Sequence, residues 1–161
     1  PVDNGIIFCG HLARLVDYGG SPMVLDQKTT GMPVGPYFFD QFTPDTQMSM
    51  YTFAGKMIFN IPDKGVVIDA AQIAINFTRY ERGTAFRTEG QLNEWYDETL
   101  QTIEKAQTAS REEHFPMNTT ACGNFGGCEF RKICSKSPEV REQFLKGNFS
   151  RRKTWDPMES R

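Results

Sequence analysis

Residues 10–30, GHLARLVDYGGSPMVLDQKTT, carry two apolar runs on either side of the turn-forming residues 19–22. This pattern predicts two short strands joined by a tight turn. Side chains two apart in a strand share a face, so Asp26 and Lys28 are predicted to point together while Gln27 points away. A carboxylate beside an ammonium on one rigid strand can seat a hard metal ion and the water that it activates.

The chain has 161 residues, which is enough for one domain with a hydrophobic core. Its formal net charge of −2 argues against a protein that coats nucleic acid. The charge is uneven, however, because nine Lys or Arg and four Asp or Glu follow residue 130, against nine and sixteen before it. The basic C-terminal end, densest at Arg151-Arg152-Lys153, is predicted either to contact phosphate or to be a solvated tail.

No apolar run approaches the roughly 20 residues that a membrane-spanning helix needs, so we expect no membrane partner. The sequence carries no secretory signal, and we therefore expect a cytoplasmic or otherwise reducing compartment. The chain begins at Pro1 and enters apolar, strand-like sequence almost at once, so we expect that an N-terminal part of the domain precedes it.

Outward from the hairpin, residues 30–42 contain several Gly and Pro and are predicted to form a loop. Thr43-Pro44-Asp45 has the form of a helix start, with a capping hydroxyl, a proline and an acid, and the helix is predicted to end near Phe59. On this helix Gln47 and Tyr51 lie four residues apart and share a face. Both side chains can hydrogen-bond a phosphate or a base.

Residues 65–78 are rich in Val and Ile and are predicted to form a buried strand. The longest helix is predicted from Thr88 to about Ser110, with Gln91 at the capping-box position. Residues 111–161 are predicted to form a separate segment with cysteines, a short helix over residues 138–146 and the basic tail. The order of strands and helices predicts an α/β fold with its sheet in the first half of the chain.

Three motifs follow one another along the first half: Gly10-His11-Leu12-Ala13, Asp26-Gln27-Lys28-Thr29 and Gln47-Met48-Ser49-Met50-Tyr51. In order and spacing they resemble the RecB-type branch of the PD-(D/E)XK nuclease superfamily, which has a Gly-x-x-Asp strand, an Asp/Glu-x-Lys strand and a Gln-x-x-x-Tyr helix. The resemblance covers residues 5–78. It implies a restriction-endonuclease-like core over residues 1–110, with a mixed central sheet flanked by helices.

The resemblance also implies an activity, that of a metal-dependent DNA exonuclease in replication, recombination or repair. Asp26 and the backbone carbonyl of Gln27 would hold Mg²⁺ or Mn²⁺, which prefer oxygen ligands. Lys28 would orient the attacking water and offset charge that develops on the phosphate. Gln47 and Tyr51 would help to place the DNA strand.

Ala13 departs from the family pattern, because it stands where the family has its first metal-binding Asp. A methyl group cannot coordinate a cation, so the resemblance implies that the chain as given binds DNA but is catalytically dead. A substitution of Asp by Ala that silences the enzyme accounts for this residue, and a naturally inactive relative is the alternative. The corresponding alternative function is a non-catalytic DNA-binding or assembly protein on a nuclease scaffold.

Three cysteines fall within thirteen residues of the C-terminal segment, at Cys122, Cys128 and Cys134. Such clustering without a secretory signal favours a metal site over disulfides. Several RecB-type nucleases are similar here, which implies a [4Fe–4S] cluster with a fourth ligand from the missing N-terminal part. Cys9 is a second candidate for that ligand, although its expected place in the first strand favours a buried thiol. With His114 the three cysteines would instead form a zinc site, as in a zinc-stapled structural protein.

Overall fold

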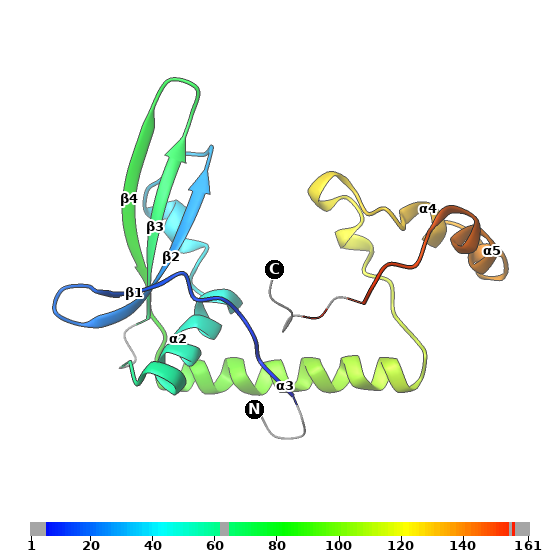
Figure 1. Cartoon of the computed structure of the whole chain (residues 1–161), viewed down its shortest axis with the longest axis horizontal. Helices are drawn as coiled ribbons and strands as arrows, with labels where there is room; N and C mark the ends of the chain where they lie inside the picture. The colour runs from blue at the N-terminus through cyan, green and yellow to red at the C-terminus, as the bar shows by residue number, and fades with distance from the viewer. Residues whose placement is uncertain (1–5, 62–64, 155, 157–161) are drawn as a thin grey trace. The chain divides into compact units, whose positions relative to one another are not determined.

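The computed structural model describes residues 6–61, 65–154 and 156. The chain divides into two compact units, Pro1–Ala106 and Gln107–Arg161. The longest helix, α3 (Glu89–Arg111), begins in the first unit and ends in the second (Figure 1). None of the helices in the described ranges combines the length and the apolar character that crossing a bilayer requires.

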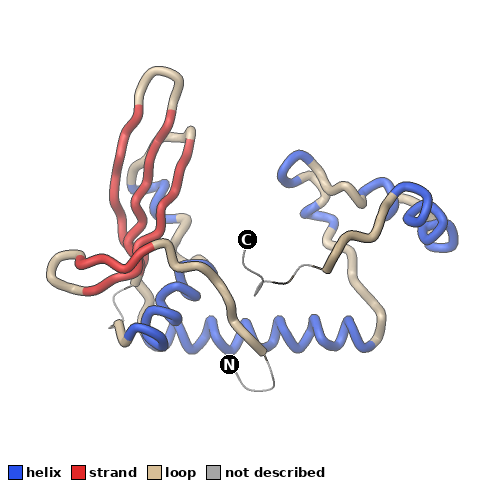
Figure 2. Tube along the Cα trace, in the orientation of Figure 1, coloured by secondary structure: helices blue, strands red, loops and turns tan. Residues whose placement is uncertain are grey.

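A four-stranded mixed sheet forms the centre of the first unit, with the strands in the order of the chain (Figure 2). The first and last pairs are antiparallel and the middle pair is parallel. A parallel pair needs a crossover, which the helices between the second and third strands provide. The fold is thus α/β, with a mixed sheet flanked by helices, as the sequence predicts. The strands are β1 (Arg14–Asp17), β2 (Pro22–Thr30), β3 (Val66–Ile73) and β4 (Thr78–Ala85).

The predicted hairpin is confirmed in β1 and β2. Gly19 and Gly20 both have positive φ, 61° and 78°, a combination that two-residue hairpin turns require and that glycine adopts without strain. The amide of Gly20 donates to Asp17 Oδ1 at 2.9 Å, which fixes the turn. The first strand is shorter than the apolar sequence suggests, because β1 begins only at Arg14 and leaves Leu12 and Ala13 outside it.

The strand predicted over residues 65–78 ends earlier, at Ile73, and a further strand follows it. This strand, β4, pairs with β3 over its whole length, from Thr78 opposite Ile73 to Ala85 opposite Val66. Its sequence, TRYERGTA, is polar and largely exposed. It therefore lacks the apolar pattern by which a strand is found in a sequence.

One face of the sheet builds the main core against the helices α1 (Pro36–Asp40) and α2 (Thr46–Phe59). Residues 30–42 were predicted to be a loop, and this prediction is wrong for α1, where Pro36 opens a short helix that buries Phe38. The buried residues of this core include Val24, Val66, Ile68 and Ala70 from the strands, and Phe38, Phe42 and Met48 from the helical side.

Helix α2 ends at Phe59 as predicted but begins later than expected. Asp45, and not Thr43, is the N-cap, and its side chain accepts a hydrogen bond from the amide of Met48 at 2.9 Å. The amide of Thr43 instead donates to Asp40 in the turn that follows α1. The capping box of α3 is confirmed, because the amides of Thr88 and Gln91 each donate to the other residue's side chain.

The second unit consists of short helices and loops. Helix α5 (Pro138–Asn148) confirms the predicted helix and extends two residues beyond it. It follows a single helical turn, α4 (Arg131–Cys134), that ends on the last cysteine. Two 3-10 turns over residues 119–121 and 124–126 precede α4 and surround Cys122.

Candidate active site

Asp26 and Lys28 lie together on the face of β2 that looks toward α2. Asp26 Oδ2 is 2.8 Å from Lys28 Nζ. The alternation that points Val24 into the core also points these two side chains to that side, whereas Gln27 is exposed on the other. Only 6% of Asp26 is exposed, so its carboxylate is much less accessible to solvent than that of an ordinary surface ion pair.

Gln47 and Tyr51 continue the contact from α2. Lys28 Nζ donates to Gln47 Oε1 at 2.6 Å, and Gln47 Nε2 donates to Tyr51 Oη at 3.1 Å. Asp26, Lys28, Gln47 and Tyr51 thus form one connected series across β2 and α2. The structure brings together the four side chains that the sequence singles out.

Asp26 Oδ2 is buried and lies 2.8 Å from Lys28 Nζ, so its charge is already balanced by the ammonium, although the two atoms form no hydrogen bond of good geometry. A carboxylate and a backbone carbonyl are oxygen ligands of the kind that hard cations prefer. No group of three or more His, Cys, Asp or Glu side chains among the described residues is placed to hold a metal ion, so Mg²⁺ or Mn²⁺ at Asp26 and the Gln27 carbonyl stays a prediction.

Ala13 lies one residue before β1 and is exposed. The register of β1 with β2 begins at Arg14 opposite Leu25, so Ala13 and Asp26 are each one residue from this pair but are not themselves paired. Leu12 packs against the core on the Asp26 side of the sheet, which shows that the alternation of β1 does not continue unchanged through Ala13.

Arg87 supports the site in a way that the sequence does not indicate. Its side chain is buried, with 4% exposed, and Nε donates to Ser49 Oγ at 3.0 Å. Nη2 donates to the carbonyl of Asp45 at 3.3 Å. These bonds hold the first turn of α2, which carries Gln47. Nothing in the sequence distinguishes Arg87 from its exposed neighbours, because its partners are neutral oxygens from distant segments.

Replacing Arg87 by Met is expected to lower the free energy of unfolding by about 2–4 kcal/mol, because two or more buried hydrogen bonds to a charged donor are lost. The matched control is Arg82→Met, which removes an arginine paired with Asp69 at 3.0 Å but half exposed, and which should cost less than about 1 kcal/mol. Urea denaturation measures both. Equal losses would show that Arg87 does not anchor α2.

The three clustered cysteines, unlike Asp26, Lys28, Gln47 and Tyr51, do not form one connected group. Cys122 and Cys134 are half-buried, Cys128 is exposed, and all are free thiols. The amide of Cys128 donates to the carbonyl of Cys122 at 3.1 Å, which closes the loop between them. Among the described residues, however, no group of three or more His, Cys, Asp or Glu side chains is placed to hold a metal ion. The cluster, and the alternative zinc site with His114, therefore stay predictions.

Cys9, the other candidate for a fourth ligand, lies before β1 and is exposed. The expectation of a buried thiol within the first strand is therefore wrong. Its neighbour Phe8 packs into the first unit, where the Phe8 ring contacts Phe53 of α2 and Trp95 of α3.

No family model, no curated protein and no solved structure matches this chain. Any functional conclusion therefore depends on the chemistry of the residues that the fold brings together.

Proposed function

We propose that this chain is the core of a metal-dependent DNA exonuclease of the RecB-like PD-(D/E)XK type, in a form that lacks one metal-binding carboxylate. The observation that carries the proposal is the connected series of Asp26, Lys28, Gln47 and Tyr51. Lys28 and Gln47 are 19 residues apart in the chain, yet their side chains meet directly. An ion pair that served only stability would not need this continuation onto α2.

Asp26 and the Gln27 carbonyl are the residues that would hold Mg²⁺ or Mn²⁺ in this proposal. When bound, the cation supplies acidification of water and neutralisation of phosphate charge. The buried position of Asp26 strengthens its attraction for a cation, because charges interact more strongly where water is excluded.

Lys28 is suited to stabilise charge on a phosphate. Its ammonium has three N–H groups, and its contacts to Asp26 and Gln47 hold it in place beside the Phe42 ring, whose centroid is 5.9 Å away. A positive group fixed in advance stabilises the negative charge that develops during phosphodiester hydrolysis without having to reorganise. Gln47 is exposed and can turn an amide hydrogen toward DNA, while Tyr51 orients that amide.

Ala13 is the observation that favours a second function. With no carboxylate at position 13, the chain itself would hold a divalent ion weakly and would cleave DNA poorly. A non-catalytic DNA-binding or assembly protein would have the same residue as its native one. The two functions differ in what an added carboxylate does, since a scaffold that never catalysed has no reason to respond to it.

The test is therefore the Ala13→Asp variant, incubated with end-labelled single- and double-stranded DNA and Mg²⁺ or Mn²⁺. Metal-dependent release of labelled nucleotides supports the nuclease. DNA binding without cleavage in either metal supports the non-catalytic alternative. A chain that neither binds nor cleaves DNA contradicts both.

The iron–sulfur cluster stays a prediction from the cysteine spacing. Anaerobic purification followed by iron, acid-labile sulfide and zinc analysis separates the two metals, since a cluster contains iron and sulfide and a Cys3His site contains zinc. Alanine at Cys128 should lower whichever content is found. Protein free of all three would rule out a resident metal on these thiols.

A further inference from the structure

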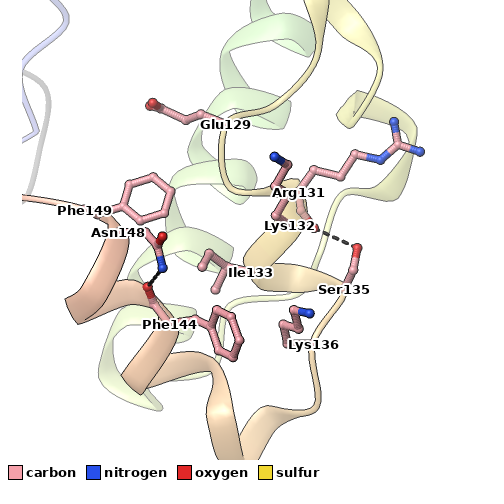
Figure 3. A pocket seen from close by; sticks show the side chains of 9 residues that line it. All are labelled: Glu129, Arg131, Lys132, Ile133, Ser135, Lys136, Phe144, Asn148 and Phe149. Atoms are coloured by element: carbon pink, nitrogen blue, oxygen red, sulfur yellow. Dashed lines mark hydrogen bonds between the residues drawn. The ribbon is translucent and has the colours of Figure 1, made fainter.

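A pocket of about 550 Å³ lies in the second unit, between α4 and α5 (Figure 3). Two kinds of side chain meet in its wall. Arg131, Lys132 and Lys136 supply positive charge, and Ile133, Phe144 and Phe149 supply apolar surface. In Figure 3, Ile133 lies between the two phenylalanine rings, and Lys136 lies beside Phe144. The pocket is thus suited to a ligand that carries both negative charge and an apolar surface.

The positive charge of the pocket is not neutralised by its surroundings. Residues 131–153 contain eight Lys or Arg and only two acids. Both acids are on α5, and one of them, Glu142, is paired with Lys146, whose hydrogen bond and charge lower the pKa of Glu142. Within the described part of the chain, none of the three pocket cations has an ion pair, and the pocket wall contains one acid, Glu129.

Two contacts order the aromatic rings of the pocket. Phe149 stacks on Phe130, with ring centroids 5.0 Å apart and planes inclined by 16°. Phe144 has 40% of its surface exposed, and Lys136 Nζ is 4.9 Å from its ring centroid. Exposed aromatic faces in a positively charged groove bind single-stranded nucleic acid, because every base can stack and every phosphate is attracted.

We propose that this pocket binds an unpaired nucleotide of single-stranded DNA, with the base against Phe144 and its phosphates toward Lys136 and Lys132. The choice of DNA rests on the proposed nuclease function, whereas the requirement for an unpaired base comes from the pocket itself. A paired base cannot reach Phe144 without leaving its stack. The exposed residues Arg151 and Arg152 follow Phe149 after one intervening residue and add positive charge beyond the pocket.

The test measures binding of the full chain to fluorescein-labelled oligo(dT) of roughly 12 nucleotides by anisotropy, in EDTA so that no metal site takes part. Phe144→Leu keeps the apolar volume and removes the ring, and it should weaken binding by about fivefold or more. Lys136→Gln should weaken binding about threefold and reduce the magnitude of the salt slope by about 0.7. Lys146→Gln, which removes an equal charge outside the pocket, should leave the affinity within about twofold.

Equal affinity of the parent chain and Phe144→Leu, with circular dichroism unchanged, would overturn the site. So would a loss in Lys146→Gln as large as that in Lys136→Gln, because binding would then follow net charge alone. Duplex DNA bound as tightly as oligo(dT) would contradict stacking, and tighter binding of oligo(rU) would contradict DNA as the ligand. Because this assay excludes metal, failure of Ala13→Asp to cleave DNA leaves its result unaffected.

Discussion

Ala13→Asp is expected to raise Mg²⁺- or Mn²⁺-dependent DNA cleavage by about a hundredfold or more over the parent chain. Ala13 and Asp26 are each one residue from the paired residues Arg14 and Leu25, so in the proposed nuclease the new carboxylate is expected to reach the Asp26 side chain. Two carboxylates and a backbone carbonyl form an oxygen-rich site of the kind that hard divalent cations prefer. The expected gain is large because the parent chain offers one carboxylate where the proposed reaction needs two.

The same variant should show its metal site in stability as well as in activity. Without metal, two carboxylates side by side repel each other, so Ala13→Asp should melt below the parent chain in EDTA. Millimolar Mn²⁺ should raise its melting temperature more than that of the parent, because a ligand that binds the folded state stabilises it. Ala13→Asn, which has nearly the same size but no charge, is the matched control and should show neither effect.

Two further substitutions assign the activity to the connected series. In the Ala13→Asp chain, Asp26→Asn should abolish the gain in cleavage and the response to Mn²⁺ together. Lys28→Met should reduce cleavage by about 100- to 1000-fold while the Mn²⁺ response is retained, since in the proposed reaction the ammonium acts on the phosphate and not on the cation. Cleavage that survives both changes would come from a contaminating nuclease.

Gly65→Ala is expected to destabilise the first unit by about 3 kcal/mol or more. Gly65 has φ of +84°, and a Cβ built on it would lie 2.0 Å from the carbonyl oxygen of Ala85 and 2.9 Å from Phe86 Cα. Both atoms belong to backbone at the end of β4 and cannot turn aside as a side chain could. A change of this size is a large share of the roughly 5–15 kcal/mol that holds a typical domain folded.

Urea denaturation followed by circular dichroism measures this loss. Gly31→Ala is the control, since its Cβ would meet nothing within 4 Å, and it should change the stability by less than about 0.5 kcal/mol. A Gly65→Ala midpoint that equals the Gly31→Ala midpoint would mean that the start of β3 does not approach β4 as closely as the structure has it.

Local rules predicted the parts of the fold that local chemistry determines. The glycine turn between β1 and β2, the shared face of Asp26 and Lys28, and the Thr88–Gln91 capping box all depend on residues within four positions of one another. Each of these features could be predicted because the interaction that fixes it is encoded in a short stretch of sequence.

The remaining features depend on distant partners. Helix α1 buries Phe38 against the core, and its five residues would not be helical by propensity alone. The partners of Arg87 lie about 40 residues away along the chain. The meeting of Lys28 with Gln47 could be expected only from the order of the motifs, because no periodicity indicates which helix face approaches which strand.

The polar character of β4 has an effect on how copies of this protein behave toward each other. In the part of the chain that the structure describes, β4 is the last strand of the sheet, so its outer backbone groups could pair with another molecule. Its side chains include Arg79, Glu81 and Arg82, each joined to an opposite charge of its own chain. Charged side chains on an edge strand discourage edge-to-edge aggregation. The same polar residues that make β4 hard to recognise in the sequence are therefore expected to oppose self-association at high protein concentration.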